Sequence, residues 1–276
     1  HGEKLVFQFG KLLLEMDARH SFSLLRFCIM LCYTPKKMAA GYHGSEHPEP
    51  SVVGSGPYST AIKMKKRNAP LLHIDPRAHT ARDVYKLMTG LIVPRPIALV
   101  STVDGTGAAN VAPFSFFCGV GSVPPTLLFC PALHRAHPDP ALRKDTLRNV
   151  EETGEFVVNV VSQAIAEAAN LAAADVPPEV DEFALAGLTP LASEMVRAPR
   201  VAESPAQMEC KLIQVIYTSR EPGAGVIVLG EIVRFHVRED LVENFRVAPE
   251  GLDAVGRMAG NTWVRTRDRM ELIRPK

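Results

Sequence analysis

The most informative stretch of the chain is Leu91-Ile-Val-Pro-Arg-Pro-Ile-Ala-Leu-Val-Ser-Thr-Val103, which is followed at once by Asp104-Gly105. Branched apolar residues favour a β-strand, and an Asp-Gly pair between apolar runs is a strong signal for a hairpin turn. We therefore predict a strand over residues 91–103 and a return strand over residues 109–117.

The sequence on either side of this hairpin predicts further strands and several short helices. A helix closed by Gly90 is predicted before it, over residues 81–88. After it we predict a strand over 126–130, an irregular loop over 131–143, a helix over 144–154, a strand over 155–161, an alanine-rich helix from Ser162 to Ala174, and strands over 207–219 and 226–238. Six or so strands with short helices between them predict a mainly β fold, a barrel with peripheral helices.

The first 70 residues differ from the rest in composition. Residues 41–60 hold Gly, Ser, Pro and His with almost no apolar periodicity, which is typical of a disordered linker. Residues 1–37 begin with His and lack the regions of a signal peptide, whereas Met38 begins a more ordinary N-terminus. We therefore predict that residues 1–70 are an extension, with Met38 as the natural start, and that residues 71–276 form the folded domain.

Composition limits the function classes. The 276 residues carry 31 basic and 30 acidic side chains, so the chain lacks the basic excess typical of nucleic-acid binders, and we expect no such partner. The longest apolar stretch, residues 22–33, is shorter than the ~20 residues of a membrane span, and we expect no membrane partner. Five cysteines without a disulfide framework favour a reducing, cytoplasmic compartment. His134 and His137 lack a nearby third ligand, so no metal site is predicted.

Common catalytic signatures such as GxGxxG, GxxxxGK[ST], HExxH and GxSxG are absent from the sequence. Two segments combine small, hydroxyl and basic residues at element ends: residues 95–102 with their hairpin partner 110–117, and Lys144-Asp145-Thr146. Hydroxyls and N–H groups at a helix start, with a lysine close by, form a pocket for an anion. The alternative is an ordinary strand and a solvated lysine. The adjacent carboxylates Asp181 and Glu182 are predicted to lie in a surface turn.

Several of these motifs together resemble the flavin reductase-like family. They are Gly90-Leu-Ile-Val-Pro-Arg-Pro-Ile-Ala-Leu-Val-Ser-Thr102, Asn110-Val-Ala-Pro-Phe-Ser-Phe-Phe117, Pro124-Pro-Thr-Leu-Leu-Phe129 and Lys144-Asp-Thr-Leu-Arg-Asn149, with Asp181-Glu-Phe183 and Gly230-Glu-Ile-Val following in order. The resemblance covers about residues 71–276. It implies the FMN-binding split β-barrel fold and a homodimer with FMN bound near the subunit interface.

The resemblance also implies a set of cofactor-binding residues. In such proteins the phosphate and ribityl chain lie against the strand, the hairpin and the Lys-Asp-Thr helix start, with Asp145 better suited to cap that helix. The resemblance also suggests Trp263, near the C-terminus, as a residue close to the flavin or the nicotinamide; the alternative is that it fills a contact between subunits. The implied residues here are Arg95, Ser101, Thr102, Asn110, Ala112, Pro113, Ser115, Lys144, Thr146 and Trp263.

The implied activity is electron transfer from NADH or NADPH through bound FMN to a flavin or another small-molecule acceptor. A flavin carries this chemistry itself, so no catalytic side chain is expected. Three alternatives remain open: a non-catalytic FMN-binding electron carrier, a flavin-dependent oxygenase component, and a pocket for a different phosphate-bearing or tetrapyrrole ligand.

Overall fold

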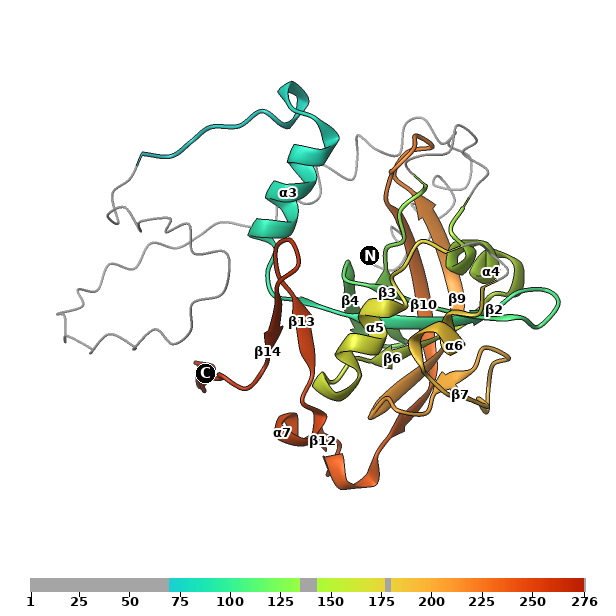
Figure 1. Ribbon diagram of the computed structural model, residues 1–276. Coiled ribbons are helices and arrows are strands. Elements are labelled where there is room, and N and C mark those ends of the chain that lie inside the picture. The colour runs from blue at the N-terminus through green and yellow to red at the C-terminus, as the bar shows by residue number, and fades with distance from the viewer. Residues whose placement is uncertain (1–69, 135–142, 177–179, 276) are drawn as a thin grey trace, which may run out of the picture. The chain divides into compact units, whose positions relative to one another are not determined.

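The computed structural model describes residues 70–134, 143–176 and 180–275, and residues Leu72–Lys276 form one compact unit (Figure 1). The predicted extension, the linker over 41–60 and the start at Met38 lie outside the described residues, as does most of the predicted loop over 131–143. These predictions therefore remain predictions.

The described chain begins with the short helix η1 (Pro76–Ala78) and the helix α3 (Ala81–Leu91). Thr80 caps α3, because its side chain accepts a hydrogen bond from the Asp83 amide. The prediction that Gly90 closes this helix was wrong, since Gly90 lies within it. A nearby side chain instead binds carbonyls at the end of α3: Arg95 Nη1 donates to the carbonyl oxygens of Thr89 and of the C-cap residue Ile92, each at 2.7 Å.

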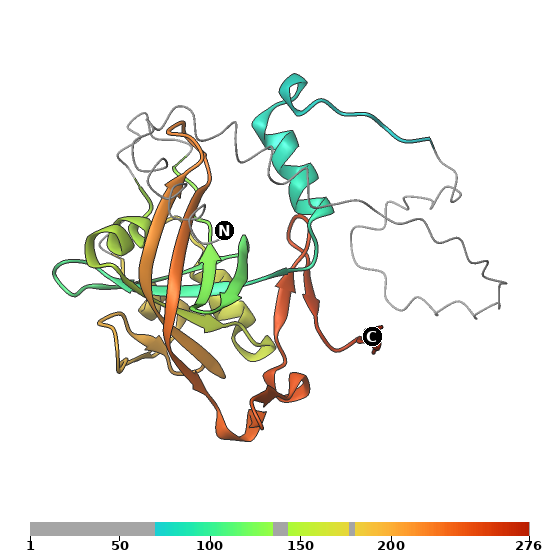
Figure 2. The ribbon, with the colours of Figure 1, turned by 180° about the vertical axis from the view of Figure 1, so that it is seen from behind.

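The body of the protein is a seven-stranded antiparallel sheet in the order β3-β2-β6-β9-β10-β5-β4. Its strands are β2 (Ala98–Val103), β3 (Ala109–Phe114), β4 (Phe117–Ser122), β5 (Pro125–Phe129), β6 (Glu155–Val160), β9 (Ala206–Tyr217) and β10 (Val226–Val237). The two longest strands, β9 and β10, run side by side in Figure 2. The prediction of a mainly β fold is confirmed.

The central hairpin differs from its prediction in three details. The strand predicted over 91–103 begins later, because α3 extends through Leu91, and it is divided into β1 (Arg95–Pro96), which pairs with β13 (Val255–Arg257), and β2, which pairs with β3 and β6. The turn between β2 and β3 is longer than an Asp-Gly pair: Asp104 Oδ1 accepts hydrogen bonds from the amides of Thr106 and Ala108. The return strand ends at Phe114, and β4 begins after a bend, at Phe117.

Three helices pack against the sheet: α4 (Asp145–Thr153), α5 (Ala166–Leu171) and α6 (Glu182–Ala186), with η2 (Gln163–Ile165) preceding α5 (Figure 1). Ser162 occupies the N-cap of η2 without a side-chain bond, and the predicted alanine-rich helix is shorter than expected. Two apolar clusters fill the two faces of the sheet. One contains Val100, Phe129 and Phe156 with α4, and the other contains Leu99 and Val111 with α5 and α6.

The remaining elements extend from this body. They are β7 (Pro190–Leu191), β8 (Arg200–Val201), η3 (Glu239–Leu241), β11 (Val242–Glu243), β12 (Arg246–Val247), α7 (Pro249–Leu252), β13 (Val255–Arg257) and β14 (Trp263–Arg265). β1, β13 and β14 form a small sheet beside α3. Among the described residues, no helix is long and apolar enough to cross a membrane.

Candidate functional site

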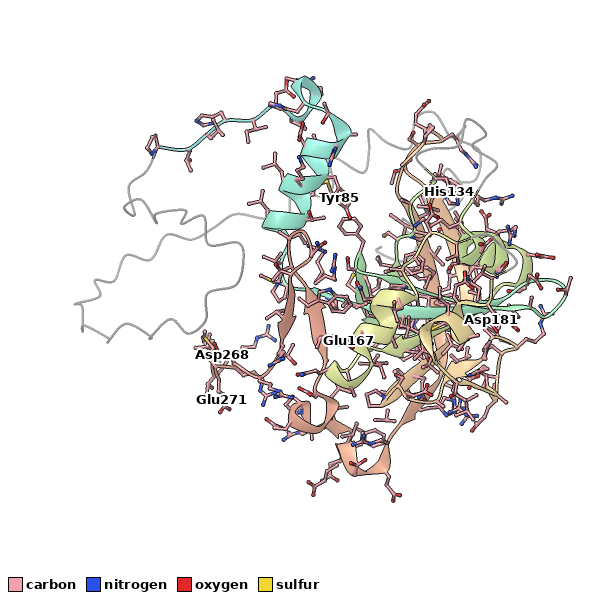
Figure 3. The ribbon with its side chains drawn as sticks, in the orientation of Figure 1. Tyr85, His134, Glu167, Asp181, Asp268 and Glu271 are labelled. Atoms are coloured by element: carbon pink, nitrogen blue, oxygen red, sulfur yellow. The ribbon has the colours of Figure 1, made fainter. Side chains whose placement is uncertain are left out.

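A cavity of about 220 Å³ opens at the start of α4. Four of the residues implied by the sequence line it: Asn110 and Ala112 from β3, and Lys144 and Thr146 from the helix start. The rest of its wall is formed by His134, Arg143, Asp145, Arg148, Ala172, Ala174, Asp175, Val176 and Glu182. Figure 3 labels His134 and also Asp181, the residue before α6.

The start of α4 offers hydrogen-bond donors to this cavity. Lys144 is the N-cap and makes no side-chain cap bond, so the first amides of the helix have no acceptor from that side chain. The prediction that Asp145 caps the helix was wrong, because Asp145 is its first helical residue and pairs with Arg148 at 2.6 Å. Arg143 pairs with Glu151. Among the lysine and arginine side chains of the wall, Lys144 is therefore the one without a carboxylate partner within the described residues.

Behind the cavity lies a buried network of polar side chains centred on Asn110. Thr146 Oγ1 donates to Asn110 Oδ1 at 2.9 Å, and Thr102 Oγ1 lies 3.4 Å from the same oxygen. Asn149 Nδ2 donates to Thr102 Oγ1 at 3.1 Å. The hydroxyl protons of Thr102 and Thr146 are therefore directed into the protein, and Thr146 can offer its backbone amide to an anion at the helix start.

Glu182 is a member of this network that the sequence did not reveal. It was predicted to lie in a surface turn, but Asn110 Nδ2 donates to Glu182 Oε1 at 2.8 Å, and the half-buried carboxyl lines the cavity. Burial raises the pKa of Glu182, and the hydrogen bond from Asn110 partly opposes that rise. The neighbouring Asp181 lies outside the network, because its carboxylate accepts from the amides of Phe183 and Ala184 and caps α6.

Ser101 and Arg95, two of the implied cofactor residues, line neither the cavity at α4 nor the space beside Trp263. Ser101 is fully buried on the opposite face of β2 from Thr102, as expected for neighbours on a strand. Its hydroxyl donates to the carbonyl of Pro199 and accepts from Asn159 Nδ2 at 3.0 Å.

Arg95 is also buried, and its guanidinium joins several segments. Besides the carbonyls at the end of α3, it reaches Ser115 Oγ through Nε at 3.3 Å and the Met258 carbonyl through Nη2 at 2.9 Å. Burial is the largest cause that lowers the pKa of Arg95. Arg95 therefore ties α3, the bend after β3 and the loop after β13 together.

Three further implied residues meet in a second cavity. Pro113, Ser115 and Trp263 line a space of about 160 Å³, together with Ile97, Asn170, Ala173 and Arg257. Trp263 and Arg257 also line a larger adjoining space of about 660 Å³. Residues 170–174, at the end of α5, contribute to the wall of both this region and the cavity at α4. Seven of the implied residues are thus divided between the cavity at the start of α4 and the cavity beside Trp263, on either side of one short segment.

Comparison with known proteins assigns the chain to a family. Residues 89–253 match the family described as flavin reductase like domain. An uncharacterised protein of Deinococcus radiodurans is 40% identical over 211 residues, covering 73% of this chain and 89% of that protein. An uncharacterised protein of Halalkalibacterium halodurans is 35% identical over 206 residues, covering 74% of this chain and 97% of that protein.

Solved structures agree with this assignment. Nitrilotriacetate monooxygenase component B from Bacillus cereus is 38% identical, with a TM-score of 0.69, covering 74% of this chain and 100% of its own. 2-Nitrobenzoate 2-nitroreductase from Pseudomonas fluorescens is 34% identical, with a TM-score of 0.66, covering 74% of this chain and 96% of its own. A split-barrel protein from Shewanella frigidimarina, 24% identical with a TM-score of 0.62, covering 72% of this chain and 96% of its own, supports the fold alone. The chain therefore belongs to the flavin reductase-like family of split-barrel flavoproteins.

Proposed function

We propose that this protein binds FMN and passes electrons from NADH or NADPH through it to a flavin or another small acceptor. The observation that carries the proposal is the cavity at α4. There the start of α4, which has no side-chain cap, lies beside Asn110 and Ala112 of β3, and Lys144 has no carboxylate partner among the described residues. Oxidoreductase neighbours at 34% and 38% identity support the activity class.

The donor set fits a phosphate monoester. The backbone N–H groups of the first turn of α4 point along the helix axis toward the cavity, and Lys144 adds a full positive charge there. Arg143 and Arg148 already have carboxylate partners, so Lys144 is the residue that we assign to hold the phosphate.

The protein's own contribution is binding and orientation. A bound flavin supplies hydride acceptance and onward electron transfer. Asn110 is held in one orientation by Thr146 and Glu182, so its position beside the helix start is fixed before any ligand arrives. Pro113 and Trp263 offer apolar surface that keeps water from a planar ring in the second cavity.

A second candidate function is the reductase component of a two-component oxygenase. Its support is the 38% identity with a protein named as component B of a monooxygenase. In that case the acceptor is a free flavin handed to a separate oxygenase.

The decisive experiment is the visible spectrum of the purified protein, reconstituted with FMN and then mixed with NADH or NADPH without oxygen. We expect a flavin spectrum that bleaches on addition of the nicotinamide. A protein that stays colourless with FMN would contradict cofactor binding, and a spectrum that stays oxidised would identify an electron carrier that needs another donor. Adding free FMN or FAD in excess then distinguishes flavin reduction from direct reduction of an organic acceptor.

We also propose that the protein is a homodimer. Helix α3 and its C-cap expose the apolar side chains of Tyr85, Leu87, Met88, Leu91 and Ile92, and exposed apolar patches mark interaction surfaces. Leu91 is 80% exposed, and Leu272, near the C-terminus and outside this group, is 82% exposed, so Leu272 serves as a control position of equal exposure. We expect light scattering to give twice the chain mass, Leu91→Glu to give monomer, and Leu272→Glu to leave the dimer intact. A monomer in the unaltered protein would contradict the proposal.

A further inference from the structure

Three side chains from three strands lie on one rung of the β1-β13-β14 sheet. Arg95 is directly opposite Arg257, and Arg257 is directly opposite Trp263. Opposite residues of antiparallel strands point to the same face of a sheet. The rung therefore places two guanidinium groups and an indole side by side, with the Arg257 guanidinium 5.1 Å from the centre of the Trp263 ring.

The positive charge of this rung is not neutralised within the described residues. Arg95 donates to carbonyls and a hydroxyl, and Arg257 Nη2 donates to the Gly260 carbonyl at 2.8 Å, but neither guanidinium makes an ion pair there. The two charges act on each other: burial is the largest cause that lowers the pKa of Arg95, Tyr85 opposes it, and the charge of Arg257 lowers that pKa further. Two neighbouring cations without a carboxylate favour an anion.

The rung faces space of a suitable size. Arg257 and Trp263 line both the 160 Å³ cavity and the 660 Å³ cavity, and the larger lies within the range of small-molecule sites. Two carboxamides, Asn170 and Asn261, line the larger cavity as well. Its one described carboxylate is Glu167 on α5 (Figure 3). A flat indole, a guanidinium fork and two amides fit a planar ring that bears a carboxylate or a phosphate.

We propose that Arg257 and Trp263 form the docking subsite for an anionic, planar redox partner, with Arg257 as the residue that selects for the anion. The proposal rests on the proposed function and names the substrate class of the same site. The anionic group has two sources, the phosphates of a nicotinamide dinucleotide or the carboxylate of an aromatic acceptor.

This subsite is distinct from the proposed phosphate site of the cofactor. Lys144 and the start of α4 line one cavity, whereas Arg257 lines the others, and the end of α5 contributes to each. One anion site can therefore retain a resident cofactor while the second exchanges partners.

The test uses the chain's single tryptophan as the reporter, because Trp263 is part of the proposed subsite. Quenching of its fluorescence is titrated without oxygen with two pairs of ligands on the FMN-loaded full chain. The FMN is first reduced with dithionite for the dihydronicotinamide pair and left oxidised for the nitro pair, so that electron transfer does not consume the ligand. NADH is compared with the phosphate-free donor 1-benzyl-1,4-dihydronicotinamide, and 4-nitrobenzoate with the uncharged 4-nitrobenzyl alcohol. The variants are Arg257→Gln, Arg257→Lys and, as a control on β14 outside both cavities, Arg265→Gln.

We expect Arg257→Gln to weaken binding of the anionic member of one pair about tenfold or more, consistent with loss of a charge-assisted hydrogen bond, and to leave the neutral member unchanged. Arg257→Lys should restore part of the affinity, and Arg265→Gln should have no effect. The pair that responds identifies the source of the anion.

Three results with Arg257→Gln would overturn the subsite. They are unchanged binding of both anionic ligands, equal weakening of the charged and neutral ligands, and a loss of affinity for FMN without any loss for the other ligands. Failure of NADH and NADPH to bleach the flavin contradicts the proposed function instead, and the fluorescence titration still decides the subsite.

Discussion

Among single residues, Glu182 in the wall of the α4 cavity is expected to make the stability of the fold depend on pH. Because burial raises its pKa in the folded state, its ionisation opposes folding, and the stability associated with the neutral carboxyl is lost as pH rises through that pKa. Glu182→Gln keeps an oxygen for Asn110 without the charge. We expect the variant to match the wild type near pH 4 and to be more stable at pH 8, by less than about 1 kcal/mol because the group is partly solvated. Thermal unfolding across this range measures the difference, and an offset independent of pH would contradict it.

Glu209 shows the opposite pH dependence. The fully buried carboxylate accepts from the amides of Glu194, Met195 and Val196 at 2.8, 2.6 and 3.2 Å, and lies 2.5 Å from His236 Nε2. Burial alone would raise its pKa, but these hydrogen bonds hold the pKa of Glu209 below its ordinary value. Its contribution to stability is therefore present at neutral pH and lost as pH falls through the folded-state pKa.

We expect Glu209→Gln to lower the free energy of unfolding by about 2–4 kcal/mol at pH 7, because buried donors lose a charged acceptor. The deficit should shrink on acidification. Urea unfolding at pH 7 and pH 4 measures both effects. The exposed Glu239→Gln is the control and should change stability little. A full deficit at pH 4 would show that packing, and not charge, is responsible.

At the scale of elements, the start of α4 can be tested through Lys144. Lys144→Ala removes a cation from the cavity wall and leaves the buried network intact. Thr146→Ala is less suitable, because it would remove a hydrogen bond to Asn110 within that network. We expect FMN to bind about tenfold more weakly, roughly 1.4 kcal/mol, and riboflavin, which has no phosphate, to bind unchanged. The exposed Lys211→Ala, on β9, is the control for nonspecific charge. Equal FMN affinity in Lys144→Ala, measured by flavin fluorescence, would remove this phosphate site.

Elements with strong local signals could be predicted from the sequence. Strands β6, β9 and β10 have apolar runs, and α4 ends where Gly154 takes a left-handed conformation (φ 70°). β4 was missed because its sequence, Phe-Cys-Gly-Val-Gly-Ser, has weak strand propensity and forms by pairing with β5. The end of α3 was misplaced because its last carbonyls bind Arg95, a contact that local propensity does not contain.

At the scale of the whole molecule, the candidate site combines residues that are far apart in the chain. Asn110 and Lys144 lie within segments that carry the family resemblance, and the structure brings both to one cavity. The sequence did not reveal Glu182, whose partner Asn110 is 72 residues away, or the rung that joins Arg257 to Arg95. Ser101 follows the same pattern: its strand is predictable from local residues, but only the packing of Pro199 and Asn159 shows where its hydroxyl is engaged.

The folded unit itself allows a prediction about the first part of the chain. Residues Leu72–Lys276 form a compact unit, and both apolar clusters of the sheet are built from residues 97–255 and Trp263. We therefore expect a chain that begins at Met38 to keep the unfolding temperature of the full chain within about 2 °C, since it loses none of these core contacts. It should also bind FMN with equal affinity. Calorimetry and a flavin titration of the two proteins side by side measure this, and a weaker cofactor affinity at unchanged unfolding temperature would show that residues 1–37 contribute to the site and not to the fold.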